Sequence, residues 1–222
     1  MAITILTGHS VSFPDPTRAD SAGLVAIGGE LSTDRLLAAY RSGVFPWTSE
    51  PVTWWSPDPR AVFELEEFRV SRSLARTVRK GVFRVTMDRA FGTVIRAAAE
   101  LAPGREETWI TPSFISAYTR LHTEGHAHSV ECWMGEELVG GVYGVAIGGL
   151  FAGESMFHRV SNASKVALFH LVEHLRSRQF RLFDIQMLTP VTTQLGGIYV
   201  SREEYLGRLA EALKSSVSFL PV

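Results

Sequence analysis

The stretch "HSVECWMGEELVGGVYGVAIGGLFAGESMF", residues 128–157, decides the fold class. It is rich in β-branched, aromatic and glycine residues, and it is broken by the polar pair Gly135-Glu136. Such a run predicts successive strands over 128–134, 137–146 and 149–153, with a tight turn between the first two. A β-meander therefore forms the centre of the chain.

Helical patterns surround this meander on both sides. Capping residues and apolar periodicity predict a helix from Ser32 or Thr33 to Gly43, and others over 71–81, 88–101, 111–125, 162–178 and 201–214. Short strands are expected at Phe63–Glu66 and at 180–186. This order indicates an α+β fold with a mixed β-sheet flanked by helices. Residues 1–60 are rich in proline and glycine, and this composition changes near Ala61. We therefore expect a small N-terminal domain over 1–60 and a larger domain over 61–222.

Composition places the chain among ordinary globular proteins. Of its 222 residues, 45% are hydrophobic and 20% are charged, and no apolar run approaches the roughly 20 residues that span a bilayer. The first residues lack the pattern of a secretory signal. Cys132 is the single cysteine, which excludes an intrachain disulfide framework and fits a reducing compartment. We therefore expect a cytoplasmic protein without a membrane partner.

A basic segment lies between Arg69 and Arg84, "RVSRSLARTVRKGVFR", with six basic residues and no acidic one. The spacing of Arg72, Arg76, Arg79 and Lys80 puts them on one helical face. This face is either a solvated surface or a track for the phosphates of a nucleic acid. The net charge of −1 does not decide between them.

Three of the five tryptophans, Trp47, Trp54 and Trp55, stand within the proline-rich segment "GVFPWTSEPVTWWSPDPR". This segment excludes a helix and favours a strand poorly. Its indoles either fasten a loop to the core or stack on a flat ligand such as a nucleobase.

Three polar residues interrupt apolar surroundings. Glu154 stands between Phe151 and Phe157, so it is either a surface residue or an acid held in a pocket. Asp184 and Gln186 end a strand, and alternation puts both on one face, opposite Phe183 and Ile185. They either line a cleft at the strand end or bond a neighbouring loop.

The segment "HLVEH", His170–His174, matches the H-x-x-E-H pattern of zinc peptidases. The pattern is short, and no third-ligand segment follows it. We expect two exposed histidines on an amphipathic helix, with neither metal nor cofactor. Cys132 is expected in the core.

Together these stretches resemble one family. The motifs "GLVAIGGELSTDRLLAAYRSGVFPW", "WWSPDPR", "TWITPSFISAY", "GGVYGVAIGGLFAGESMF" and "LGGIYVSREEYL" follow, in order, the pattern of bacterial leucyl/phenylalanyl-tRNA–protein transferases. The resemblance covers about residues 13 to 210. It implies a larger domain like the GCN5 acetyltransferase fold. It also implies transfer of Leu or Phe, with Met a further option, from aminoacyl-tRNA to proteins with N-terminal Arg or Lys, which marks them for degradation.

The resemblance also implies roles for individual residues. Asp184 and Gln186 match a proton-relay pair, and Glu154 matches a pocket acid that holds the acceptor amine or its basic side chain. Trp47 and Trp109 match positions that line the site for the acceptor end of the tRNA. The aminoacyl side chain would be lined by Val142, Phe151, Leu168 and Leu171. The tRNA body would be contacted by Arg72, Arg76, Arg79 and Lys80. Ile185 stands where the family often has cysteine, so no thiol nucleophile is expected there.

We expect the Trp47 ring to face the terminal adenosine of the acceptor end. We expect Trp54 and Trp55 to hold the two domains together. The partners implied are aminoacyl-tRNA and a cationic protein N-terminus, not DNA.

Two alternatives remain. A small-molecule N-acyltransferase would carry an R/Q-x-x-G-x-G/A turn, which the sequence lacks. A non-enzymatic tRNA-binding module would leave Glu154, Asp184 and Gln186 without a role.

Overall fold

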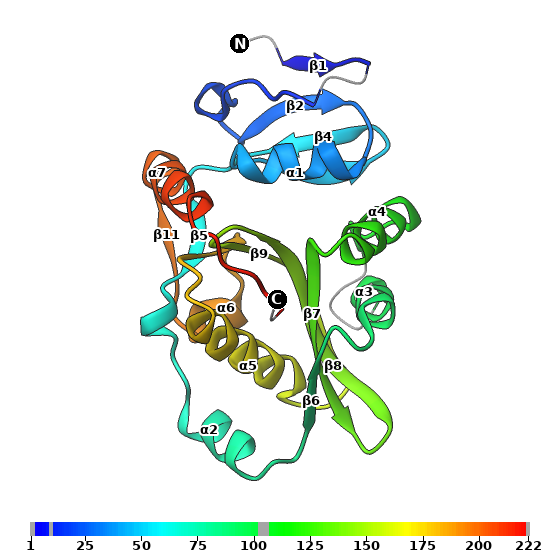
Figure 1. Ribbon diagram of the computed structural model, residues 1–222, viewed down its shortest axis with the longest axis vertical. Coiled ribbons are helices and arrows are strands. Elements are labelled where there is room, and N and C mark those ends of the chain that lie inside the picture. Colours follow the sequence, from blue (N-terminus) through cyan, green and yellow to red (C-terminus); the bar gives the residue numbers. More distant parts are fainter. Residues whose placement is uncertain (1–2, 9–10, 102–106, 221–222) are drawn as a thin grey trace.

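A computed structural model describes residues 3–8, 11–101 and 107–220, and these form two β-sheets joined by helices (Figure 1). The smaller sheet lies in the N-terminal part and has the strand order β1-β2-β4-β3. Its strands are β1 (Thr4–Leu6), β2 (Leu24–Gly28), β3 (Phe45–Ser49) and β4 (Val52–Trp55). Helix α1 (Thr33–Arg41) packs against β3, and its N-cap Ser32 accepts a bond from the backbone of Arg35.

The hairpin of β3 and β4 corrects the expectation that the tryptophan-rich segment is a poor strand. Pro46 lies in β3 and Pro51 in the turn between the strands. The register shifts between Pro46 and Thr48. Proline is tolerated at edges and irregularities of a sheet, and β3 is an edge strand. The sequence pattern alone does not reveal which edge is available.

The larger sheet has seven strands in the order β11-β5-β10-β9-β8-β7-β6. Their bounds are β5 (Arg60–Phe63), β6 (Arg84–Met87), β7 (Ala127–Met134), β8 (Glu137–Ile147), β9 (Leu150–His158), β10 (Leu182–Gln186) and β11 (Gly197–Val200). All neighbouring pairs are antiparallel except β9 and β10. A parallel pair needs a long crossover, which α5 (Ala163–Ser177) supplies.

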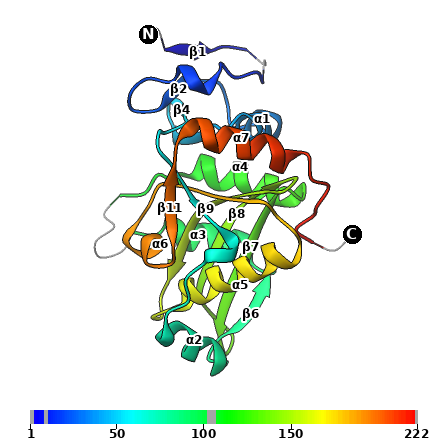
Figure 2. The ribbon, with the colours of Figure 1, turned by 90° about the vertical axis from the view of Figure 1, so that its left-hand side faces the viewer.

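Helices cover both faces of this sheet (Figures 1 and 2). Helix α5 packs on β7, β8 and β9, and α3 (Phe91–Ala99) and α4 (Pro112–Thr123) pack on the opposite face. The remaining helices are η1 (Pro16–Arg18), η2 (Leu65–Glu67), α2 (Arg72–Arg79), α6 (Pro190–Gln194) and α7 (Arg202–Leu213). None of the helices in the described ranges is long and apolar enough to cross a membrane.

Some expected elements have different bounds. The strand expected at Phe63–Glu66 ends at Phe63 and is followed by η2, because β5 extends in the other direction, to Arg60. The helix expected from Asp88 starts at Phe91, since Asp88 has a left-handed φ of 56° that a helix excludes. Strand β9 continues past residue 153 to His158. The short strands β6 and β11 were not expected.

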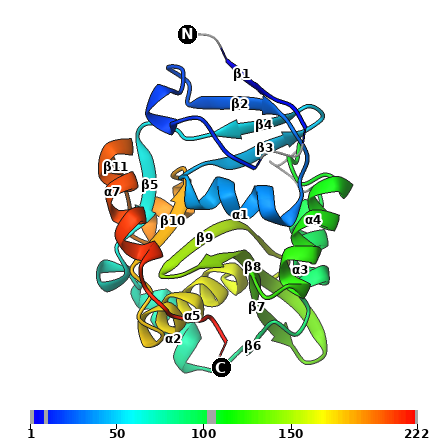
Figure 3. The same cartoon turned by 45° about the horizontal axis from the view of Figure 1, so that its top comes forward.

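The α+β fold, with a small N-terminal part and a larger mixed sheet flanked by helices, is confirmed. Helix α1 lies between the two sheets (Figure 3). One apolar cluster includes residues of both parts, among them Leu36 and Trp54 from the first and Phe114 and Leu209 from the second. The core is therefore continuous across the junction, and a boundary between residues 60 and 61 stays a prediction.

Candidate functional site

A cavity of about 350 Å³ opens where the parallel strands β9 and β10 separate. The two strands pair only as far as Ala152 and Asp184, after which β9 continues to His158 with β8 as its one partner. Gly153 to Met156 of β9 and Ile185 and Gln186 of β10 line the opening. A cleft at the carboxyl ends of parallel strands is a common ligand site.

Two β-bulges turn polar side chains into this cavity. In β9, Glu154 is the extra residue, because Gly153 and Ser155 pair with the consecutive residues Gly144 and Tyr143. In β10, the register shifts between Asp184 and Gln186, and Gln186 has a left-handed φ of 55°. Bulges are frequent beside active sites because they change the direction of a side chain.

Glu154 receives hydrogen bonds from three other elements. The hydroxyl of Tyr40 (α1) donates to its Oε1 at 2.7 Å, and that of Tyr118 (α4) donates to Oε2 at 3.1 Å. The two hydroxyls are 2.5 Å apart. The amide Nε2 of Gln186 lies 3.3 Å from Oε1 of Glu154. The carboxylate is thus fixed from both parts of the chain.

Burial raises the pKa of Glu154 to about 7, although the hydrogen bonds from Tyr40 and Tyr118 act in the opposite direction. Burial, together with the nearby Glu154 charge, raises the pKa of both tyrosines well above the ordinary value. The tyrosines therefore stay neutral donors, while the carboxyl group changes its protonation near neutral pH.

Asp184 is fully buried and forms an ion pair with Arg60, which is itself 1% exposed. Arg60 donates two hydrogen bonds to it, at 2.9 Å and 2.6 Å, and the Tyr205 hydroxyl donates another at 2.9 Å. The backbone N–H of Gln186 donates to Asp184 Oδ1 at 2.9 Å. Burial, the largest single effect, lowers the pKa of Arg60, but the charge and hydrogen bonds of Asp184, together with the nearby Tyr205 and Glu154, outweigh burial and raise it.

This geometry corrects the expectation that Asp184 and Gln186 share one face. Phe183, Ile185 and Gln186 line the cavity, whereas Asp184 is directed to Arg60 and Tyr205. The bulge at Gln186 breaks the alternation on which the expectation relied. Asp184 is fully buried and does not line the cavity, and its carboxylate accepts the backbone N–H of Gln186. Arg60 was missed, because a single arginine in a sequence carries no signal of burial.

The apolar wall also differs in part from the expectation. Val142 and Leu168 line the cavity, whereas Phe151 and Leu171 are fully buried in the core behind it. Side chains on the wall that sequence reasoning missed are Phe45, Phe63, Met156, Phe183 and Ile185. Helical periodicity marks Leu168 and Leu171 as apolar but does not say which of them meets the cavity.

Trp47 and Trp109 lie at the rim, between the cavity and a neighbouring hollow of about 720 Å³. The structure therefore brings these two residues together from β3 and from the segment before α4. Trp54, in contrast, is fully buried, donates to the carbonyl of Gly28 and packs edge-on against Phe13. The Trp55 ring lies 5.8 Å from that of Trp47.

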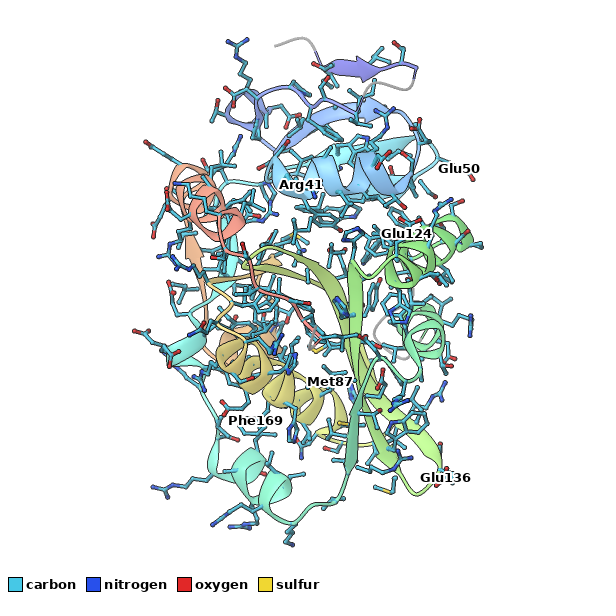
Figure 4. All side chains as sticks on the ribbon, viewed as in Figure 1. Arg41, Glu50, Met87, Glu124, Glu136 and Phe169 are labelled. Carbon is cyan, nitrogen blue, oxygen red and sulfur yellow. The ribbon has the colours of Figure 1, made fainter. Side chains whose placement is uncertain are left out.

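The basic face on α2 lies apart from the cavity. Arg72, Arg76, Arg79 and Lys80 are exposed, and in Figure 4 nitrogen-tipped side chains extend outward from α2, at the end of the molecule opposite α1. A ligand that contacts both the cavity and α2 must therefore extend along the larger sheet.

The histidines of α5 are half-buried rather than exposed. His174 Nε2 lies 2.6 Å from the carbonyl oxygen of Phe219, and burial lowers the pKa of both His170 and His174. Within the described residues, no group of three or more His, Cys, Asp or Glu is arranged to hold a metal ion. Cys132 is buried, and burial raises the pKa of its thiol to about 12.

Known proteins resemble this chain over most of its length. The model of the family "Leucyl/phenylalanyl-tRNA protein transferase" matches residues 62–210, and that of its N-terminal domain matches residues 29–58. A leucyl/phenylalanyl-tRNA–protein transferase of Anaeromyxobacter sp. (strain Fw109-5) is 53% identical over 208 residues, which cover 92% of this chain and 88% of the relative. One of Shewanella denitrificans is 50% identical and covers 86% and 82%.

Among solved structures, L-PGS from Bacillus licheniformis is similar with a TM-score of 0.42 and 11% identity, over 81% of this chain and 62% of that one. This likeness is too distant to inform on function. The family models and the curated relatives, in contrast, agree with each other. The chain belongs to the leucyl/phenylalanyl-tRNA protein transferase family.

Proposed function

We propose that this aminoacyltransferase moves Leu or Phe from aminoacyl-tRNA to the α-amine of proteins that begin with Arg or Lys. The observation that carries the proposal is a largely apolar cavity in which Glu154 and the Gln186 amide are joined by a hydrogen bond. The new N-terminal residue then serves as a degradation signal. A reaction that consumes aminoacyl-tRNA takes place in the cytoplasm.

In this proposal the donor enters with its aminoacyl side chain against Val142, Leu168 and Met156. The terminal adenosine stacks beside Trp47 and Trp109 at the rim, since indoles accept any base face. The tRNA body reaches the cations of α2, which contact its phosphates without reading sequence. This division gives the apolar wall control over the amino acid, with a modest discrimination of about 1–3 kcal/mol per methylene.

The reaction itself needs little covalent assistance, because the ester of aminoacyl-tRNA is already activated. The amine nitrogen attacks the ester carbonyl, a C–N bond forms, and the C–O bond to the ribose breaks. Holding the two reactants in register lowers the activation barrier by about 7–11 kcal/mol. The carbonyl of Gln186 accepts a hydrogen bond from the attacking amine, since its amide nitrogen is turned toward Glu154.

Glu154 accepts the proton that the amine loses and returns it to the ribose oxygen as that oxygen leaves. A proton acceptor is most effective when its pKa is close to the working pH, and the pKa of Glu154 is about 7. When ionised, the same carboxylate attracts the cationic end of the acceptor. Asp184 does not share this task, because Arg60 neutralises its charge.

The alternatives explain less of the site. A tRNA-binding module has no use for a carboxylate held by Tyr40, Tyr118 and Gln186 inside a cavity. A small-molecule N-acyltransferase shares the chemistry of amide formation but not the need for an exposed basic helix.

The proposal is tested by mixing the protein with labelled Phe-tRNA and a peptide that begins with Arg, and separately with acetyl-CoA and the same peptide. We expect a new Phe–Arg bond in the first mixture only. Product from acetyl-CoA alone, or from neither donor, contradicts the proposal.

In the first mixture, Glu154→Gln should raise the KM for the peptide and lower kcat while the Kd for Phe-tRNA stays within about twofold. An equal loss in peptide and tRNA affinity contradicts the role of Glu154.

The stability of the protein should depend on pH through Glu154. The folded state holds this proton more tightly than the unfolded chain, with a pKa of about 7 against 4.5. Its contribution to stability is therefore full below pH 4.5 and is lost as the pH rises to 7. The wild type should therefore lose this contribution between about pH 4 and pH 8, and Glu154→Gln should not. Over that range, the unfolding free energy of Glu154→Gln minus that of the wild type should rise by about 3 kcal/mol. Urea unfolding of both proteins measures this difference, and a difference independent of pH refutes the assignment.

The basic face on α2 should make tRNA binding depend on salt. If these cations displace counterions, Arg76→Gln and Arg79→Gln should each reduce the slope of log K against log salt by about one. Lys214, with a side chain 70% exposed at the end of α7, provides the matched control as Lys214→Gln. Equal slopes for wild type and both arginine variants would assign α2 to an ordinary solvated surface.

A further inference from the structure

The segment that follows α7 crosses the molecule between α5 and β7 (Figure 1). Two side chains at the C-terminal end of α5, His174 and the C-cap Arg178, hold its backbone. His174 Nε2 lies 2.6 Å from the carbonyl oxygen of Phe219, and Arg178 donates to the carbonyls of Ser218 and Leu220 at 2.9 Å and 3.1 Å. Three consecutive carbonyls are thus fixed, which determines where the side chain between them lies.

Phe219 of this segment is an integral part of the core, with 2% of its surface exposed. Its ring stacks on His128 of β7 at 4.3 Å and on Phe151 of β9 at 5.6 Å, and it contacts His174 at 4.5 Å. The segment therefore fills space between the sheet and α5 that would otherwise be a void.

Phe151 connects Phe219 to the cavity. Its ring meets that of Phe183 edge-on at 5.6 Å, and Phe183 lines the cavity together with Phe63, whose ring is 5.3 Å away. The ring of Phe151 also lies close against Gly144, where a Cβ would be 2.5 Å from it. In a densely packed interior, a ring confined in this way transmits a change on one side to the other.

We propose that Phe219 sets the depth of the cavity through Phe151 and Phe183, and thereby the preference of the enzyme between larger and smaller aminoacyl side chains. This inference rests on the proposed function, in which the cavity holds the side chain of the donor. Phe219 is a positioning residue, because two rings separate it from the donor.

Removal of the ring should deepen the cavity. In Phe219→Ala, Phe151 can tilt into the vacated space and Phe183 can withdraw from the cavity wall, which favours the larger side chain. We expect the ratio of kcat/KM for Phe-tRNA to that for Leu-tRNA to rise at least threefold. Phe219→Met, which refills most of the space with a flexible apolar chain, should restore the ratio toward the wild-type value.

A matched control separates selectivity from stability. Phe83 is another buried phenylalanine, and it directly precedes β6. Strand β6 is an edge strand, separated from the cavity strand β9 by β7 and β8. Phe83→Ala should lower the unfolding free energy and leave the ratio unchanged. If Phe219→Ala does not fold, Phe219→Leu takes its place, with an expected rise of about twofold.

A variant of the wall distinguishes failure of this inference from failure of the proposed function. Val142→Phe fills the cavity directly and should lower the same ratio. If Val142→Phe changes the ratio and the Phe219 variants leave it at the wild-type value, Phe219 has no positioning role. If neither variant changes it, the cavity is not the side-chain pocket, and the inference falls together with that assignment.

Discussion

A buried ion pair between Arg60 and Asp184 organises this molecule. Arg60 also donates to the carbonyl of Gly43, and its guanidinium lies 4.7 Å from the ring of Phe45 and 4.3 Å from that of Tyr205. It therefore joins the N-terminal part, strand β10 and helix α7. Because an unpaired charge in such a place is strongly unfavourable, the pair forces these elements to meet in one arrangement.

The site follows from this arrangement. Asp184 holds the backbone of Gln186 in a left-handed conformation, and the bulge that results turns the Gln186 amide toward Glu154. Tyr40 reaches the same carboxylate from α1, so the polar end of the cavity is complete only when the N-terminal part is docked. The apolar end depends instead on rings packed behind the wall, among them Phe151.

Local signals predicted what local sequence controls. The meander of β7, β8 and β9 follows from a run of β-branched, aromatic and glycine residues broken by a turn, and the N-caps Ser71 and Ser201 follow from capping; both signals act within a few residues. The hairpin of β3 and β4 was missed because its prolines argue against strands, which the edge position of β3 tolerates. The short strands β6 and β11 were missed because their partners are distant in the chain. Glu154 was identified as an acid among apolar neighbours. The direction of Asp184 was not, since it depends on a bulge and on an arginine 124 residues away.

The central claim is that Asp184, held in place by Arg60, positions Gln186 rather than taking part in proton transfer. A double-mutant cycle of Arg60→Met and Asp184→Asn, with unfolding free energy and transfer rate measured for each protein, tests it most directly. We predict that each single variant loses about 3–5 kcal/mol of stability along with transfer, and that the double variant loses clearly less than the sum. An Asp184→Asn protein of wild-type stability without transfer activity would contradict the claim.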